Sequence, residues 1–283
     1  MGPLTSRCKR KLAQPLRRVD RWNRFSQIIA MVKGLLIDLM GVLYVGDAAL
    51  PGAADALARV DRAGLLVRFV TNTSRKAKLE ILAHLAALGF DVAPEHVFTA
   101  ARAACDWLTK EGYAPHLLVH PKLVPDFVHC EHDGPVAVVV GDAGPYFDYD
   151  RLNAAFRLLI EGAPFLALAA NRVFRDADGK LSMDMGPFVK ALEYASGREA
   201  MLMGKPAPEF FAAAASSMSL KLKDIAMIGD DPEADVAGAL AAGAGQALLV
   251  RTGKYRAGDE RRAQPGPSAV VADLAEAVDR LLG

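Results

Sequence analysis

Four polar sites in the sequence each follow a hydrophobic run, and their residue types suit one kind of chemistry. They are Asp38, the pair Thr71-Asn72, Lys205 and the pair Asp230-Asp231. A carboxylate can attack phosphorus and form an acyl-phosphate. Its charge repels a phosphate dianion unless a cation lies between them, and Mg²⁺ commonly binds one or two carboxylates together with phosphate oxygens and water. Asp38 and Asp230 supply two carboxylates, so the set predicts a magnesium-dependent phosphoryl-transfer site.

The other groups fit the same reaction, although each has a structural alternative. Thr71 offers a hydroxyl beside the N–H groups of an expected helix start, which would suit an anion. Lys205 offers a fixed positive charge for the oxygens of a transferring phosphoryl group. Taken singly, a Thr or Asp after a strand is more often a turn or N-cap residue, and a lone Lys is more often solvated. The hypothesis therefore depends on all four sites occurring in order.

The hydrophobic pattern predicts the elements that position these sites. Short apolar runs predict buried strands at residues 34–38, 65–70, 136–140, 165–168, 226–229 and 247–250. Helices are predicted at residues 79–88, where leucines recur about once a turn, and at 152–160 and 235–242. This alternation predicts an α/β fold with a doubly wound, Rossmann-like parallel sheet. Because ligands bind at the carboxyl ends of the strands in such a sheet, the four polar sites should converge.

The chain divides into three parts by composition and pattern. Residues 105–196 hold a strand-helix-strand pattern of their own and four of the six histidines. They predict an α/β cap domain inserted into a core domain that residues 31–104 and 197–283 form. Residues 1–30 are rich in Lys and Arg, and three interpretations apply to them: a disordered basic extension, a targeting peptide or a nucleic-acid arm. We favour the first, and Met31 is an alternative start of translation.

The composition argues against several classes of protein. The net charge of +1 over 283 residues gives no overall preference for nucleic acid or a membrane surface. The longest apolar stretch, residues 28–45, is interrupted by Lys33 and Asp38. A membrane span needs about 20 mostly apolar residues, and a central Asp is costly in lipid, so no span is expected.

The cysteines and histidines do not follow the spacing of a metal or disulfide motif. Cys8, Cys105 and Cys130 lie far apart with no C-x-x-C pair, so neither a disulfide framework nor a zinc knuckle is predicted. This fits a reducing cytoplasm. Histidines at positions 116, 120, 129 and 132 lack the H-E-x-x-H arrangement, so we expect solvated or hydrogen-bonded side chains there rather than ligands.

Taken together, the four sites resemble the four ordered motifs of the haloacid dehalogenase superfamily. The motifs appear here as residues 38–44 (DLMGVLY), Thr71-Asn72, residues 204–206 (GKP) and residues 229–231 (GDD), the last followed by Asp235. The long insert between the second and third motifs is similar to the capped subgroup that includes the nucleotidase NagD and the phosphoglycolate and pyridoxal phosphate phosphatases. The resemblance covers roughly residue 32 to the C-terminus, and as a four-part set it is specific.

The resemblance implies a magnesium site. Asp38 would be the nucleophile and a Mg²⁺ ligand, with the backbone carbonyl of Met40 as a second ligand and Asp230 as a third. Asp235 would support these ligands without binding the ion itself.

The resemblance also implies how the substrate is held. Thr71 and Asn72 would hold the phosphoryl group, and Lys205 would neutralise it. The cap would select the substrate and exclude water, with Asn171 and the loop near Arg172 as candidates to contact it. The implied protein is a cytoplasmic phosphatase that acts on a small phosphorylated metabolite, with Mg²⁺ as cofactor and neither nucleic acid nor membrane as partner. Capped relatives often pair, so a homodimer is one option.

One position departs from the superfamily pattern. Phosphatases of the superfamily usually have Asp two residues after the nucleophile as general acid, and this chain has Met40 there. A thioether cannot donate a proton, and general acid–base catalysis contributes about 10²–10⁴-fold, so reduced activity is expected. Either Asp47 or Asp231 takes over, or the leaving group needs no proton. The alternatives are a catalytically impaired protein that binds a phosphorylated ligand or regulates a partner, and a transferase that uses an acceptor other than water.

Overall fold

A six-stranded parallel sheet forms the centre of the core, in the order β14-β13-β12-β1-β4-β5. We describe residues 2, 32–130, 133–175 and 180–283 from a computed structural model. The strands are β1 (Gly34–Asp38), β4 (Leu66–Thr71), β5 (Val97–Thr99), β12 (Ile225–Gly229), β13 (Gln246–Val250) and β14 (Ala269–Val271). The strand order reverses between β1 and β12, and at such a reversal a doubly wound sheet opens a crevice for a ligand. Asp38 ends β1 and Asp230 directly follows β12, so both lie at that point.

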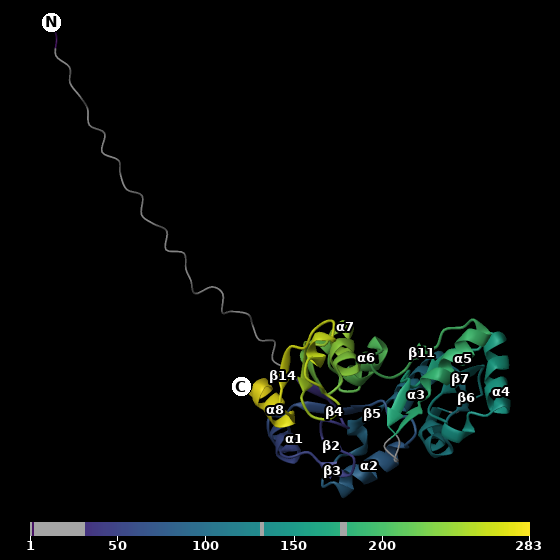
Figure 1. Cartoon of the computed structure of the whole chain (residues 1–283), viewed down its shortest axis with the longest axis horizontal. Coiled ribbons are helices and arrows are strands. Elements are labelled where there is room, and N and C mark those ends of the chain that lie inside the picture. Colours follow the sequence, from purple (N-terminus) through teal and green to yellow (C-terminus); the bar gives the residue numbers. More distant parts are fainter. Residues whose placement is uncertain (1, 3–31, 131–132, 176–179) are drawn as a thin grey trace. The chain divides into compact units, whose positions relative to one another are not determined.

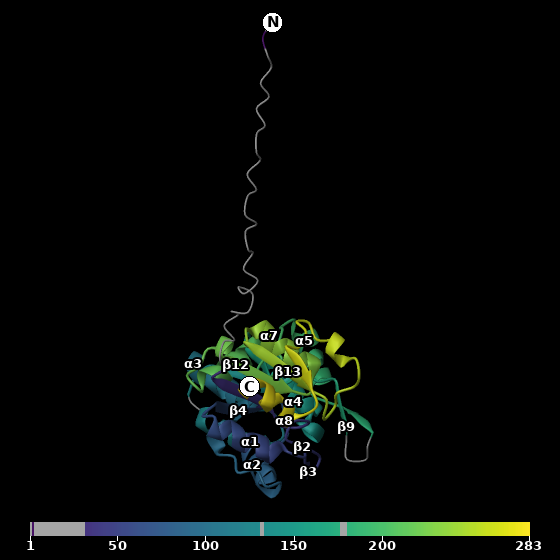
Figure 2. The ribbon, with the colours of Figure 1, turned by 90° about the vertical axis from the view of Figure 1, so that its left-hand side faces the viewer.

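Helices cover both faces of the core sheet, which confirms the predicted doubly wound architecture. Leu35 and Ile37 of β1 belong to a buried cluster with α1 (Ala53–Arg62), α2 (Lys78–Ala87) and α8 (Leu274–Leu282). Leu36, which points to the other face, belongs to a cluster with α3 (Ala100–Glu111), α6 (Pro208–Ser216) and α7 (Gly238–Ala242). In Figures 1 and 2, α1 and α2 lie on one side of the sheet and α7 on the other. Because β1 is buried on both faces, it reads as an unbroken apolar run.

A second parallel sheet, in the order β11-β8-β7-β6, forms the cap. Its strands are β6 (Ala114–Leu118), β7 (Val136–Val140), β8 (Phe165–Ala167) and β11 (Met201–Leu202). Helices α4 (Tyr149–Ile160) and α5 (Gly186–Ser196) and the 3₁₀ segment η2 (Pro121–Cys130) pack around it, as Figure 1 shows for the two α-helices. An antiparallel hairpin of β9 (Val173–Arg175) and β10 (Leu181–Met183) precedes α5. The predicted cap limits of 105 and 196 stay a prediction: residue 105 lies within α3, and β11 pairs with β8 although it follows residue 196.

The chain crosses from core to cap and back at neighbouring points. It leaves the core at Thr99, whose hydroxyl accepts a hydrogen bond from the backbone N–H of Arg102 at 3.1 Å and caps α3. It returns at Gly204, after β11. A Cβ added to Gly204 would lie 3.3 Å from the Cβ of Ala100, so the two crossings are in contact. Glycine at position 204 permits this close approach.

A disulfide joins Cys105 of α3 to Cys130 at the end of η2, and both residues are buried. The prediction that the cysteines form no disulfide is therefore wrong for this pair. The two residues are 25 positions apart, and only the packing of α3 on η2 brings them together, which spacing cannot reveal. Cys8 lies outside the described residues, as does the predicted basic extension at residues 1–30 apart from Gly2.

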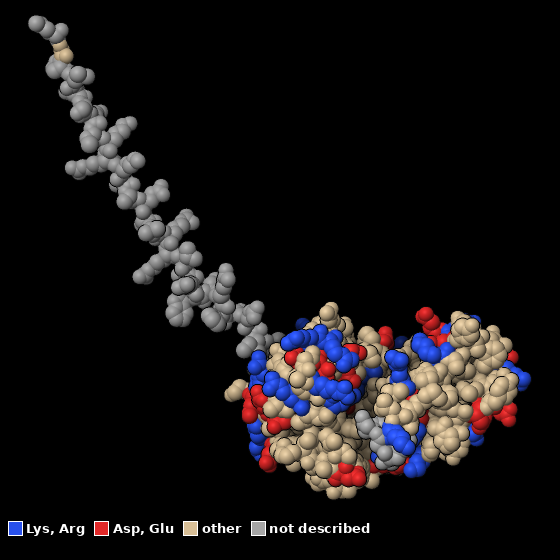
Figure 3. Space-filling model, viewed as in Figure 1, with Lys and Arg blue, Asp and Glu red and all other residues tan. Residues whose placement is uncertain are grey.

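The six strands predicted from the apolar runs are all present, within one or two residues of the expected limits. The helix predicted at residues 235–242 begins earlier, as the π-helical segment η5 (Pro232–Ala237), and continues as α7. The remaining short elements are β2 (Tyr44–Val45), β3 (Ala48–Ala49), η1 (Pro94–His96), η3 (Gly144–Tyr146), η4 (Leu222–Asp224) and η6 (Asp259–Arg261). Within the described residues, no helix is long and apolar enough to cross a membrane. Basic and acidic side chains are interspersed on the face shown in Figure 3.

Candidate active site

Three carboxylates meet at the point where the order of the core strands reverses. Asp38 lies at the end of β1, Asp230 follows β12, and Asp235 lies in η5. One oxygen from each lies within 4.8 Å of the others, and all three residues are buried. The structure thus brings Asp38 and Asp230 together, as the sheet rule predicts for residues nearly 200 positions apart. Among the described residues, no histidine or cysteine joins a comparable group.

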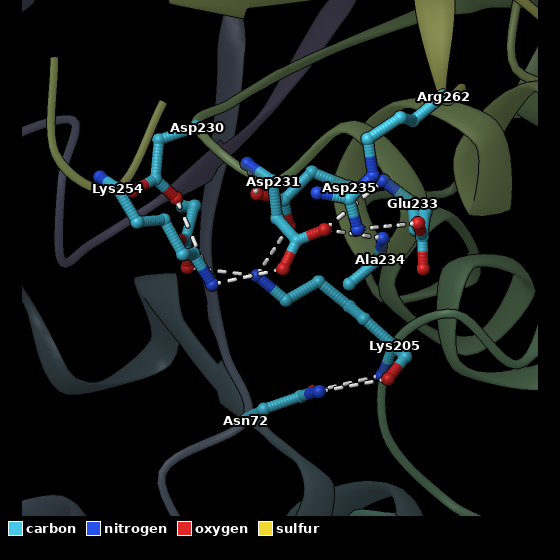
Figure 4. Close-up of polar contacts among 10 residues, drawn as sticks. Asn72, Lys205, Asp230, Asp231, Glu233, Ala234, Asp235, Lys254 and Arg262 are labelled. Atoms are coloured by element: carbon cyan, nitrogen blue, oxygen red, sulfur yellow. Dashed lines mark hydrogen bonds and ion pairs between the residues drawn. The ribbon is translucent and has the colours of Figure 1, made fainter. Parts of the chain in front are cut away.

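Lys205 lies between two of these carboxylates. Its Nζ is 2.7 Å from Oδ1 of Asp38 and 2.6 Å from Oδ1 of Asp235. Burial alone would lower the pKa of the Lys205 ammonium, but Asp235 and Asp38 more than offset this, so the pKa is raised. The side chain is therefore a permanent cation beside the nucleophile expected from the sequence. Figure 4 shows Lys205 extended toward the acidic group.

Asn72 fixes the backbone of Lys205. Its Nδ2 donates to the Lys205 carbonyl at 2.7 Å, and its Oδ1 accepts from the Lys205 N–H at 2.8 Å (Figure 4). The amide thus positions Lys205, and Asn72 also lines the cavity described below, so its predicted contact with a phosphoryl group stays a prediction. Thr71 is buried at the end of β4, and its Oγ1 accepts from the N–H of Thr73 at 3.1 Å. This closes the turn that follows the strand.

The Asp230 carboxylate is held in a tight space that leaves one oxygen without a partner. Its Oδ2 accepts the backbone N–H of Lys254 at 2.8 Å, whereas its buried Oδ1 has no hydrogen-bond partner in the described part of the chain. Gly41 and Gly253 have φ values of +92° and +64°, and a Cβ at either would overlap this carboxylate. Burial is the main cause that raises the pKa of Asp230 to about 6. A buried oxygen without a donor is what a metal ligand offers.

The donor set fits Mg²⁺. The ion prefers hard oxygen ligands and uses few carboxylates. Asp38 and Asp230 provide such oxygens, and Met40, whose backbone carbonyl could be a third ligand, lines a cavity together with Asp38. Asp235 is engaged elsewhere: its Oδ1 faces Lys205, and its Oδ2 accepts the N–H of Asp231 at 3.1 Å. This matches the supporting position expected for Asp235.

Neither of the two acids that the sequence offered in place of residue 40 is suited to donate a proton. Asp47 lies in the turn between β2 and β3 with its side chain 98% exposed, and it does not line the cavity. The Oδ1 of Asp231 accepts the N–H groups of Glu233 and Ala234 at 3.0 and 2.8 Å. Burial would raise the pKa of Asp231, but Lys254 and these backbone N–H groups lower it below its ordinary range. Asp231 is therefore an ionised helix cap.

Lys254 is a site residue to which the sequence assigned no role. Its N–H holds Asp230, and its Nζ lies 2.9 Å from Oδ2 of Asp231 (Figure 4). Burial would lower the pKa of this ammonium, but Asp231 and the other acids raise it. The sequence did contain a sign of this role, because the Thr-Gly-Lys sequence at 252–254 follows the carboxyl end of β13, where such sheets bind ligands.

The cap closes one side of a cavity of about 320 Å³ that Asp38 lines from the core. Asp142, Asn171, Phe174 and Asp184 line it from the cap, and among them Asn171 was expected from the sequence. Arg75, from the loop after β4, links the two sides. Its Nε is 2.7 Å from Oδ2 of Asp142, and its guanidinium carbon lies 5.0 Å from the ring centre of Phe174. The cavity therefore has an end in the core lined by Asp38 and Lys205 and a polar, partly aromatic end in the cap.

Asp184 differs from the other acids that line the cavity because, among the described residues, no Lys or Arg nitrogen lies within 3 Å of its carboxyl group. Its Oδ1 accepts the N–H of Met185 at 2.7 Å, and the Asn171 side chain hydrogen-bonds it. Burial is the main cause that raises the pKa of Asp184; those hydrogen bonds and Arg75 act against it, and Asp142 adds to it. Asp184 is thus a buried carboxyl with a tendency to keep its proton.

Comparison with known proteins gives family matches over both parts of the core. Residues 35–131 match the haloacid dehalogenase-like hydrolase family, and residues 202–277 match the HAD-hydrolase-like family. The chain is 42% identical over 251 residues to haloacid dehalogenase-like hydrolase domain-containing protein 2 of Bos taurus, covering 89% of this chain and 96% of that one. It is 43% identical over 260 residues to phospholysine phosphohistidine inorganic pyrophosphate phosphatase of Bos taurus, covering 90% and 96%.

Solved structures share the fold of this chain over most of its length. NagD from E. coli K-12 is 25% identical, with a TM-score of 0.79 over 87% of this chain and 98% of that one. Glycerol phosphate phosphatase from Mycobacterium tuberculosis, in complex with magnesium, is 29% identical, with a TM-score of 0.77 over 88% of this chain and 77% of that one.

Proposed function

Because this chain belongs to the NagD-like haloacid dehalogenase-like hydrolases and is a phosphoric monoester hydrolase, we propose that it hydrolyses a small phosphate monoester through a phosphoryl group carried on Asp38. Mg²⁺ is the proposed cofactor. When bound, it would neutralise charge between the carboxylates and the phosphate. Asp38, Asp230 and the carbonyl of Met40 would hold it. The observation that carries the proposal is the buried group of three carboxylates with Lys205 at the strand reversal.

The residues of the site divide the work between attack and charge. Asp38 attacks phosphorus, and the acyl-phosphate that forms is later hydrolysed by water. Lys205, which Asn72 and Asp235 hold in place, stabilises charge on the oxygens of the transferring group. The turn after Thr71 would present backbone N–H groups to the same oxygens. Preorganised charges of this kind act strongly in a buried site, because no water must reorient.

The test is the substitution Asp38→Asn with 4-nitrophenyl phosphate as substrate and Mg²⁺ present. The amide keeps the size of the carboxylate and can still contact Lys205, but it cannot form an acyl-phosphate. We expect phosphate release to fall by about 10³-fold or more, a loss of the size seen when nucleophiles are removed. Glu209→Gln, at an exposed position in the first turn of α6, is the matched control and should leave turnover unchanged. Turnover retained in Asp38→Asn would refute the proposal.

Met40 supports a second candidate, a protein that binds a phosphorylated ligand and turns it over poorly. The Met40 side chain is 58% exposed at the cavity and has no proton to give. Leaving groups that need little protonation would be affected least. A substrate screen should therefore include phosphohistidine, phospholysine and pyrophosphate, which appear in the name of one relative. Phosphate-ligand binding without any turnover across the screen would favour the second candidate.

The setting of the reaction is also a proposal. The partner would be a small phosphorylated metabolite rather than nucleic acid or membrane, with a homodimer as one form of assembly. We propose the cytoplasm, as the sequence favours, although the Cys105–Cys130 bridge is more typical of an oxidising compartment. A count of free thiols in protein taken from cells, under alkylating conditions, tests this point. Two protected cysteines would count against a reducing location.

A further inference from the structure

The cavity holds five carboxyl groups among the described residues, and four of them face a cation. Asp38 and Asp235 lie beside Lys205, Asp142 beside Arg75, and Asp231 beside Lys254, each with a nitrogen within 3 Å. A carboxylate whose oxygens are engaged by a cation is poorly placed to give a proton to a leaving group. Burial raises the pKa of Asp235, but its two oxygens contact Lys205 and the N–H of Asp231. Asp184 is the exception in the part of the chain that the structure describes. Its partners are a backbone N–H and an amide side chain.

We propose that Asp184 is the general acid of the reaction and takes the place of the aspartate that is missing at position 40. This assignment rests on the proposed function, because Asp184 would supply a proton to the leaving group of the same phosphoryl transfer. The cap brings Asp184 to the cavity from the segment between β10 and α5. The cap residues of the cavity would surround the leaving group if the phosphoryl group lies on Asp38 and Lys205.

The hydrogen bonds of Asp184 hold its carboxyl group in one orientation. Asn171 reaches it from the loop after β8, and Met185 N–H reaches it from the start of α5. Both partners can contact one oxygen while the other carries the proton into the cavity. The raised pKa of Asp184, caused mainly by burial, favours the protonated form that a general acid needs. The charged groups that act on Asp184 are Asp142 and Arg75, which oppose each other.

The proton that Asp184 gives in the first step is replaced in the second step. In the first step Asp38 attacks phosphorus, and the bond from phosphorus to the leaving oxygen breaks with its electron pair on that oxygen. The Asp184 carboxyl gives this oxygen its proton, so the leaving group departs as a neutral alcohol or phenol. In the second step the Asp184 carboxylate takes a proton from a water whose oxygen attacks phosphorus. The bond to Asp38 breaks, which frees phosphate and restores both carboxyl groups to their starting state.

The test compares two substrates of similar shape that differ in their need for a proton. The nitrophenolate of 4-nitrophenyl phosphate leaves readily as an anion, whereas the more basic phenolate of phenyl phosphate gains most from protonation. In Asp184→Asn we expect first-turnover release of phenol from phenyl phosphate to slow by about 10²-fold, within the range for general acids. First-turnover release of nitrophenol from 4-nitrophenyl phosphate should slow less than about threefold, which also shows that the variant folds, whereas hydrolysis of the acyl-phosphate should slow alike for both esters. An equal slowing of first-turnover release on both substrates, or none on either, would overturn the proposal.

A second variant tests the same idea by restoring the donor elsewhere. In the background of Asp184→Asn, the change Met40→Asp places a carboxyl two residues after the nucleophile. It should raise first-turnover release of phenol at least tenfold, with little change in first-turnover release of nitrophenol. Absence of this rescue would also overturn the proposal. The proposed function itself fails differently, because it predicts that the unmodified protein releases nitrophenol and that Asp38→Asn does not.

Discussion

The core and the cap are each built on a parallel sheet, but the two sheets contribute differently to the cavity. Both sheets are parallel, and in both the carboxyl ends of strands face the same cavity. Asp38 lies at the end of β1 in the core, and Asp142 and Asn171 come after β7 and β8 in the cap. The core groups are tied to one another around Lys205, which is buried. The cap groups are tied mainly through Arg75, which is part of the core. Under the proposed function, the core would carry out the phosphoryl chemistry, whereas the cap would contact what is attached to the phosphate.

The largest effect should come from Lys205→Met, which breaks the core side of this comparison. Loss of the cation leaves Asp38 and Asp235 facing each other, and removing a stabiliser of the transition-state charge costs about 10²–10³-fold. We expect that loss on every monoester tested, regardless of leaving group. Steady-state turnover on the 4-nitrophenyl and phenyl esters measures it. A loss confined to one ester would contradict the division of labour between core and cap.

The same variant should lose stability in a pH-dependent way. Removing one partner of a buried ion pair costs about 3–5 kcal/mol. Burial already raises the pKa of Asp235, and loss of Lys205, which opposes this effect, should raise that pKa further, so the folded state binds more protons than the unfolded state. Stability should then decline as pH rises through the pKa of folded Asp235 and recover toward acid. Thermal unfolding at pH 5 and pH 8 measures this, and Lys223→Met, exposed at the opposite end of β12, is the control that should show neither change.

The next effect concerns the link between α3 and the η2 segment of the cap. The Cys105–Cys130 bridge closes a segment of 25 residues, and loss of such a link lowers stability by about 3 kcal/mol. Reduction, or Cys105→Ser, should lower the unfolding temperature while turnover of 4-nitrophenyl phosphate at 25 °C stays within twofold. Neither cysteine lines the active cavity. The variant should be insensitive to added reductant, and a reductant effect as large as in the unmodified protein would assign the loss to another group.

The smallest effect should come from Arg75→Met, which loosens the link between the two sheets. The side chains of Asp142 and Phe174 would lose their contact with the guanidinium of Arg75. We expect KM for aryl phosphates to rise about tenfold with kcat nearly unchanged, since misplacement of the binding side costs mainly affinity. Arg102→Met, which removes an exposed pair with Asp106 on α3, is the matched control. A fall in kcat without a change in KM would show that Arg75 acts in the chemical step.

The core was predictable because its residues obey a rule that sequence can express. Buried parallel strands read as apolar runs, and polar residues after them must meet, so Asp38 and Asp230 were placed correctly relative to each other. Asn72 was also placed correctly, but its amide holds Lys205, a detail that depends on the path of the chain returning from the cap.

The cap was less predictable for physical reasons. Asp184 follows β10, a short strand with an exposed leucine and methionine, so no apolar run marks it. Asp184 stands out because the other acids that line the cavity each pair with a cation, whereas Asp184 does not within the described residues. Only coordinates show this difference. The cysteine pair is similar, because helix packing rather than spacing brings Cys105 to Cys130.

The contact between Gly204 and Ala100 has a practical consequence for engineering and for evolution. An insert whose two ends touch can be exchanged without moving the halves of its host, because both junctions stay where they were. A foreign cap grafted between these two points would meet an unchanged catalytic sheet. New substrate ranges could then arise by transplanting whole modules, with the requirement that the graft bring a proton donor of its own.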